Sequence, residues 1–175
     1  MREKGIYEQF PIWIVIIANA FALLIYLLGS YILFSAHWIL GIAYILFLLY
    51  IELKIVSKHC IDCYYFGKTC GFGKGRISAW FFKKGDSSRF CAMKITWKNM
   101  IPDFLVSLIP VICGIVLMIK NFEFKVLIAV ILIVLLTTFG NGFIRGSLTC
   151  KFCKQREIGC PADQLFNQKE SVKDA

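Results

Sequence analysis

The pattern of apolar and polar positions divides the chain into two long uncharged stretches with a polar region between them. No charged residue occurs from Gln9 to Ile51, and between Phe104 and Ile144 only the short link Lys120–Lys125 carries charge. One crossing of a bilayer needs about 20 apolar residues, so each stretch is long enough for two crossings. The pattern therefore predicts an all-α integral membrane protein with four transmembrane helices.

We place the first two helices at Phe10–Leu28 and Ile32–Ile51, with Gly29–Ser30 as the turn. The third and fourth are expected at Phe104–Ile119 and Val126–Ile144. The mean hydropathy of +0.69 agrees, because it is too high for a soluble domain of 175 residues.

Each predicted hairpin is followed by cysteines in the pattern C-x2-C-x6-C, and the two copies are offset by 90 residues. The central motif and the C-terminal motif consist, respectively, of Cys60, Cys63 and Cys70, and of Cys150, Cys153 and Cys160. A recurring unit of this kind indicates two tandem hairpin repeats with cysteine-rich knuckles. We divide the chain into a hairpin (1–58), a cysteine-rich loop (59–99), a second hairpin (100–145) and a cysteine-rich tail (146–175).

Lys and Arg are distributed very unevenly: 18 flank the cysteine motifs and the N-terminus, and two, Lys120 and Lys125, lie in the opposite loops. The cytoplasmic loops of membrane proteins carry an excess of Lys and Arg, so both termini and both motifs are expected on the cytoplasmic side of the cell membrane. The same asymmetry explains the net charge of +9. Since no recognition module accompanies these residues, nucleic acid is not expected as a partner.

The central region also carries apolar residues of the kind found at membrane surfaces. Trp80–Phe82 and Trp97 suit the interfacial aromatic belt, and Lys83 and Lys84 follow at the level of the headgroups. Within the predicted bilayer there is no buried charge of the kind that marks an ion path, which argues against a channel or transporter.

Seven of the eight cysteines fall on the predicted cytoplasmic side, whereas Cys113 lies inside the third apolar run. A reducing compartment disfavours disulfides and favours metal binding. Two cysteines separated by two residues can turn both sulfurs towards one ion. The glycine-rich stretch Gly71–Arg76 is expected to form a tight turn whose N–H groups point at the bound thiolates.

Two ligand arrangements remain open at this point. In one, Cys60, Cys63, Cys150 and Cys153 surround a single tetrahedral ion that bridges the two halves. In the other, each motif has its own site, Cys91 completing the central one and His59 the C-terminal one, unless His59 merely caps a helix. The candidate metal ligands are thus His59, Cys60, Cys63, Cys70, Cys91, Cys150, Cys153 and Cys160.

Three functions fit these features. The preferred one is an accessory or structural subunit, with zinc holding the cytoplasmic segments and with membrane-protein partners or further copies of itself. The alternative is an iron–sulfur electron-transfer subunit of a redox complex. The third is a thiol–disulfide enzyme, because four helices with a C-x-x-C pair resemble the quinone-linked disulfide-generating membrane oxidoreductases. The working cysteines of those enzymes face the oxidising side, whereas the cysteines of this chain are expected in the cytoplasm. We expect no enzymatic activity from this chain on its own.

Overall fold

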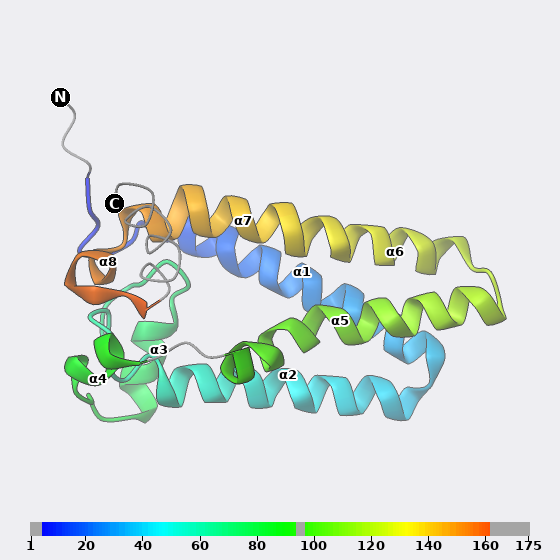
Figure 1. The fold of residues 1–175 in the computed structure, drawn as a ribbon, viewed down its shortest axis with the longest axis horizontal. Coiled ribbons are helices and arrows are strands. Elements are labelled where there is room, and N and C mark those ends of the chain that lie inside the picture. Colours follow the sequence, from blue (N-terminus) through cyan, green and yellow to red (C-terminus); the bar gives the residue numbers. More distant parts are fainter. Residues whose placement is uncertain (1–4, 94–96, 162–175) are drawn as a thin grey trace, which may run out of the picture.

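The computed structural model describes residues 5–93 and 97–161, with the backbone alone at 97–100. This part of the chain is helical and contains no strand, only an isolated bridge between Tyr7 and Cys153. Four segments are long and apolar enough to cross a membrane, and they lie side by side along the long axis of the molecule (Figure 1). They are α1 (Ile12–Ala36), α2 (Trp38–Lys58), α5 (Trp97–Lys120) and a fourth that begins with α6 (Phe124–Leu135).

The first interhelical turn lies seven residues beyond the position predicted from sequence. Helix α1 continues through Gly29–Ser30 and ends at Ala36, and the extended residue His37 makes the turn. Nδ1 of His37 accepts a hydrogen bond from the N–H of Ile39 at 3.2 Å and so caps α2. Gly29 serves helix packing instead, because a Cβ there would lie 2.6 Å from the hydroxyl oxygen of Tyr44. The predicted turn at Gly29–Ser30 was therefore wrong.

The fourth long helix reaches further than Ile144, the end predicted from sequence. It runs on to Phe152, so that Cys150 lies in its last turn and the predicted start of the tail at 146 falls inside it. After α6 it consists of a π-helical segment, α7, a second π-helical segment and a 3-10 turn, namely Leu136–Gly140, Asn141–Phe143, Ile144–Thr149 and Cys150–Phe152. In the first π-helical segment the hydroxyl of Thr138 donates to the carbonyl of Val134 at 2.6 Å.

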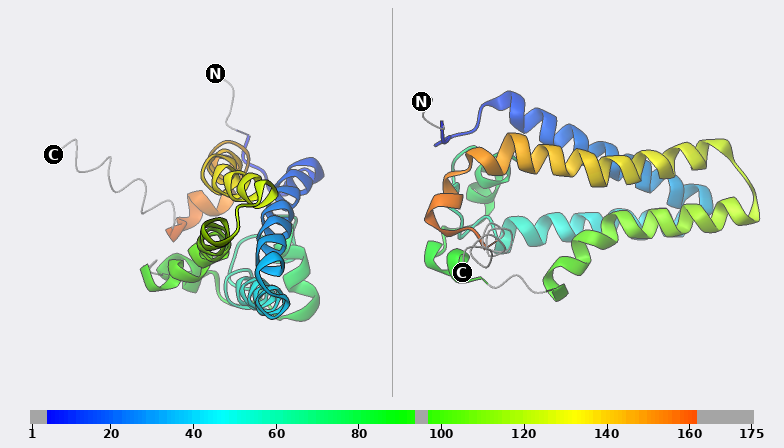
Figure 2. Two further views of the ribbon diagram at one scale, coloured as in Figure 1. Left: turned by 90° about the vertical axis from the view of Figure 1, so that its right-hand side faces the viewer. Right: turned by 45° about the horizontal axis from the view of Figure 1, so that its top comes forward.

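The remaining helices are short and gather at one end of the bundle (Figure 1). They are α3 (Lys74–Phe81), α4 (Ser87–Ala92) and α8 (Lys154–Gly159). Viewed along its axis, the bundle shows α3 on the periphery next to α2 (Figure 2). Along the bundle the outer faces are apolar and exposed, as at Leu23, Leu46 and Ile115, which suits contact with lipid.

Candidate functional site

Both cysteine motifs lie at the same end of the bundle. The central motif follows α2, and the C-terminal motif begins in the last turn of the fourth helix and continues around α8. One apolar cluster joins them, because Cys63, Cys70 and Cys153 all pack against a buried core of Phe10, Ile14 and Tyr65. Segments about 90 residues apart thus form one structural unit, hereafter the cysteine-bearing end.

Tyr65 fastens three segments of this end to one another. Its side chain is only 1% exposed. Its hydroxyl donates to the carbonyl of Tyr7 at 2.5 Å and accepts from the N–H of Lys154 at 2.9 Å. The N–H of Tyr7 in turn donates to the carbonyl of Phe152 at 3.0 Å. The segment before α1, the central loop and the chain around Cys153 are therefore held in register by part-buried hydrogen bonds around the buried Tyr65 ring.

Gln155 makes the second connection between the motifs. The side chain is 2% exposed, and its Oε1 accepts from the N–H of Tyr64 at 2.8 Å and lies 3.8 Å from Sγ of Cys63. Its Nε2 lies 3.8 Å from Sγ of Cys91 and donates to the carbonyl of Gly159 at 3.4 Å. Sequence reasoning missed this residue, since a glutamine in a polar tail carries no signal of burial.

Backbone N–H groups are directed at several of the sulfurs. The N–H of Gly75 lies 3.4 Å from Sγ of Cys70, so the glycine-rich stretch does place a donor at a cysteine. Only glycine fits at position 75, because a Cβ would collide with the carbonyl oxygen of Tyr65. Burial raises the pKa of Cys153 overall, but backbone hydrogen bonds from Gln155 and Arg156 act against that rise. Donors of this kind stabilise thiolates, the form that binds metal.

Burial of the cysteines raises their pKa values, and this effect outweighs the hydrogen bonds from the backbone. It raises the pKa of the Cys60 thiol to about 11, of Cys63 to about 12 and of Cys153 to about 11. Cys60, Cys70 and Cys153 also lie near enough to Cys63 to raise its pKa further by charge repulsion. These thiols therefore hold their protons at neutral pH unless a cation replaces them.

The segment between Cys60 and Cys63 contains a second residue that the sequence analysis passed over. The Asp62 side chain is 8% exposed, and among the described residues no donor reaches its buried Oδ1. Gly85 is what allows this burial, because a Cβ there would collide with the same oxygen. A buried carboxylate oxygen without a partner is costly, and a cation would offset that cost.

Not all predicted ligands come together. Within residues 5–93 and 97–161, no three His, Cys, Asp or Glu side chains are arranged as a metal site. Cys91 lies beside the C-terminal motif, with Sγ 3.8 Å from the carbonyl of Ile158, rather than completing the central motif. Cys150 is the one exposed thiol, and Cys160 is half-buried next to Gly159.

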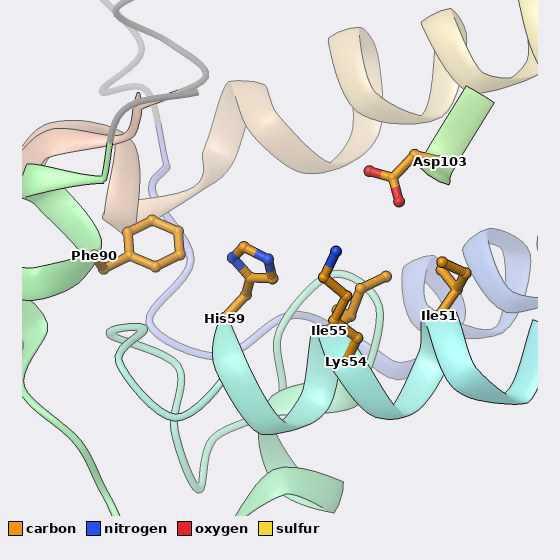
Figure 3. Close-up of a pocket in the computed structure, with 6 residues that line it drawn as sticks. All are labelled: Ile51, Lys54, Ile55, His59, Phe90 and Asp103. Carbon is orange, nitrogen blue, oxygen red and sulfur yellow. The ribbon is translucent and has the colours of Figure 1, made fainter. Parts of the chain in front are cut away.

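His59 is the C-cap residue of α2, and its backbone N–H donates to the carbonyl of Ile55 at 3.0 Å. Its ring lines a cavity of about 250 Å³ together with Lys54, Phe90 and Asp103 (Figure 3). No cysteine is among the described residues that line this cavity, and burial lowers the pKa of the imidazole. The backbone of His59 thus caps α2, and ligation of the C-terminal motif by its ring stays a prediction.

Compared with protein-family models, curated proteins and solved structures, the chain matches none.

Proposed function

We propose that the cysteine-bearing end binds a metal ion through thiolates and that the ion fastens the central loop to the end of the fourth helix. The observation that carries the proposal is the meeting of two C-x2-C-x6-C motifs in one apolar cluster, with Cys63 and Cys153 packed on the same core. Buried, protonated thiols pack as small apolar side chains, whereas a metal ion bound by the thiolates adds its binding free energy to the stability of the fold.

A site that bridges the motifs fits these contacts better than two separate sites. Cys63 has Cys60, Cys70 and Cys153 as its electrostatic neighbours, and Cys150 neighbours Cys153. We propose that Cys60, Cys63, Cys150 and Cys153 close around the ion as a four-thiolate set when the metal binds. Zinc is the preferred ion, because it accepts any tetrahedral thiolate set and needs no redox partner.

In this account the protein is an accessory membrane subunit, with the metal shaping its cytoplasmic face for partner proteins or further copies of itself. The 18-to-2 distribution of Lys and Arg supports placing that face in the cytoplasm. Reduced thiols persist in that compartment, which agrees with metal binding and disfavours a disulfide-generating enzyme.

An iron–sulfur cluster is the second candidate, and the N–H group of Gly75 directed at Cys70 favours it. Such N–H···S bonds set the reduction potential of a cluster, and the same cysteines would hold it. The chain would then transfer electrons within a larger redox complex, because it offers no motif for a second cofactor.

Limited proteolysis with and without a chelator tests the proposal. In purified full-length protein, we expect metal removal to speed trypsin cleavage at Lys68 and Arg89, with helical circular dichroism almost unchanged. The rate should recover when the metal is returned. The Cys63→Ser variant is the control, because its cleavage should already be fast and insensitive to chelator. Cleavage of the native protein that ignores the chelator would contradict the proposal.

A further inference from the structure

Helix α3 turns its large apolar residues outward and its small residues towards the bundle, the opposite of a surface helix on a water-soluble protein. The face turned towards the bundle carries small residues, with Gly75 buried and Ser78 fully buried. The outward face carries Ile77, Trp80 and Phe81, which are 45%, 75% and 74% exposed. A helix that buries glycine and serine while exposing tryptophan and phenylalanine requires an apolar medium on its outer side.

Polar bonds fix this orientation. Ser78 donates its hydroxyl to the carbonyl of Val56 at 3.1 Å, and Lys74 forms an ion pair with Glu52 at 2.6 Å. Glu52 also accepts from the hydroxyl of Tyr26 at 2.6 Å. These bonds tie α3 to the end of α2, so it cannot roll over to bury its aromatic face against the bundle.

The position of α3 matches the surface of a bilayer. It lies beside the end of α2 at the outside of the molecule and runs across the direction of the long helices (Figures 1 and 2). The helix therefore lies parallel to a membrane that the four long helices cross. Arg76, Lys83 and Lys84 are exposed around the aromatic face, and Phe82 is 38% exposed. Aromatic rings flanked by cations are typical of segments that rest among anionic headgroups.

We propose that α3 and the following Phe82–Lys84 form a peripheral anchor that inserts its aromatic face into the headgroup region and binds anionic phospholipid. An anionic bilayer is the partner that this surface fits, because the surface is apolar, is flanked by positive charge and continues the lipid-facing surface of α2. The anchor holds the central loop against the membrane whether or not a metal is bound.

Fluorescence of Trp80 tests this proposal in the full-length chain. Trp13, Trp38 and Trp97 are replaced by Phe, and the protein is placed in nanodiscs of phosphatidylcholine mixed with phosphatidylglycerol. In separate samples one or the other lipid carries bromine close to its headgroup. We expect blue-shifted emission, quenching by both brominated lipids, and stronger quenching by the anionic one. Water-exposed emission without quenching by either lipid would overturn the anchor, and equal quenching by the two would overturn the preference for anionic lipid.

Charge variants sharpen the second part of this test. Lys83→Gln combined with Lys84→Gln should reduce the enrichment of phosphatidylglycerol at Trp80 by about fivefold per charge, as expected for cations near an anionic surface. Lys120→Gln combined with Lys125→Gln removes the same charge from the opposite loop and should change nothing. Equal effects of the two pairs would contradict a local lipid site. Circular dichroism confirms that each variant is folded.

Discussion

At the scale of single residues, the cysteine-bearing end depends on two side chains that are not themselves candidate ligands. Every polar atom of the Tyr65 and Gln155 side chains makes a hydrogen bond, and two of these bonds join the central loop to the chain after the fourth helix. Such second-layer bonds orient metal ligands and restrict the positions that the sulfurs can occupy. The residue-scale predictions therefore concern both a supporting residue and the ligands.

Gln155→Leu should weaken metal binding without removing a ligand. The change leaves the part-buried N–H of Tyr64 without its acceptor, which costs about 1–3 kcal/mol. Loss of such a supporting bond lowers metal affinity by about 10–100-fold. Competition with a chromophoric chelator measures this affinity. Glu157→Gln, an exposed change on the same short helix α8, is the matched control and should have no effect. An unchanged affinity in Gln155→Leu would show that Gln155 does not support the site.

The cysteines themselves should separate into two groups. Cys63→Ser is expected to abolish metal binding, because Cys63 lies at the centre of the neighbouring thiols. Cys113→Ala should leave the metal content of the purified protein unchanged, because Cys113 packs in the bundle between the long helices. Elemental analysis of both variants makes the comparison, and equal losses in the two would point to unfolding rather than ligation.

At the scale of elements, the uncharged runs predicted the four long helices because a bilayer demands length and apolarity and little else. The positions of the helix ends were harder to predict. Gly29–Ser30 has the composition of a turn, yet Gly29 is needed where α1 and α2 approach closely. The fourth helix extends beyond its apolar run, because the hydrogen bonds of a helix can continue through polar residues that lie in water.

Gly29→Ala tests that account of the first hairpin. The added methyl group would displace the ring of Tyr44, whose hydroxyl donates to the carbonyl of Val106 at 2.6 Å. Overpacking of this kind costs about 1–3 kcal/mol, so the thermal midpoint should fall. Gly142→Ala is the control, because nothing lies within 4 Å of its added carbon, and it should be neutral or slightly stabilising. If Gly29→Ala were as well tolerated as Gly142→Ala, close helix packing would not be the reason for the glycine.

At the scale of the whole molecule, the sequence predicted that the motifs would share one end, because each follows an even number of crossings. It did not predict how they join. The links through Phe10, Tyr65 and Gln155 depend on the path of the loops, which have no periodic pattern to interpret. The position of Cys91 beside Ile158 has the same origin, because α4 is carried there by the fold of residues 59–86.

Thiol labelling of intact cells tests the orientation of the whole molecule. Asn121 lies in the exposed turn between α5 and α6, so an Asn121→Cys variant should react with an impermeant reagent from outside. Ser87→Cys, exposed at the cysteine-bearing end, should react only after the membrane is permeabilised. The reverse result would place the motifs on the outer side and restore the disulfide-enzyme hypothesis.

The most direct test of the central claim is to identify the metal in anaerobically purified protein by elemental analysis. X-ray absorption spectroscopy at the metal edge then shows whether its ligands are sulfur atoms. We expect a colourless protein with zinc coordinated by sulfur at about 2.3 Å, and we expect no zinc in Cys63→Ser. A brown, reducible protein with iron and acid-labile sulfide would instead favour the second candidate function, electron transfer by an iron–sulfur cluster. Protein without metal, or metal retained by Cys63→Ser and without sulfur ligands, would contradict the claim that this end of the molecule is a thiolate metal site.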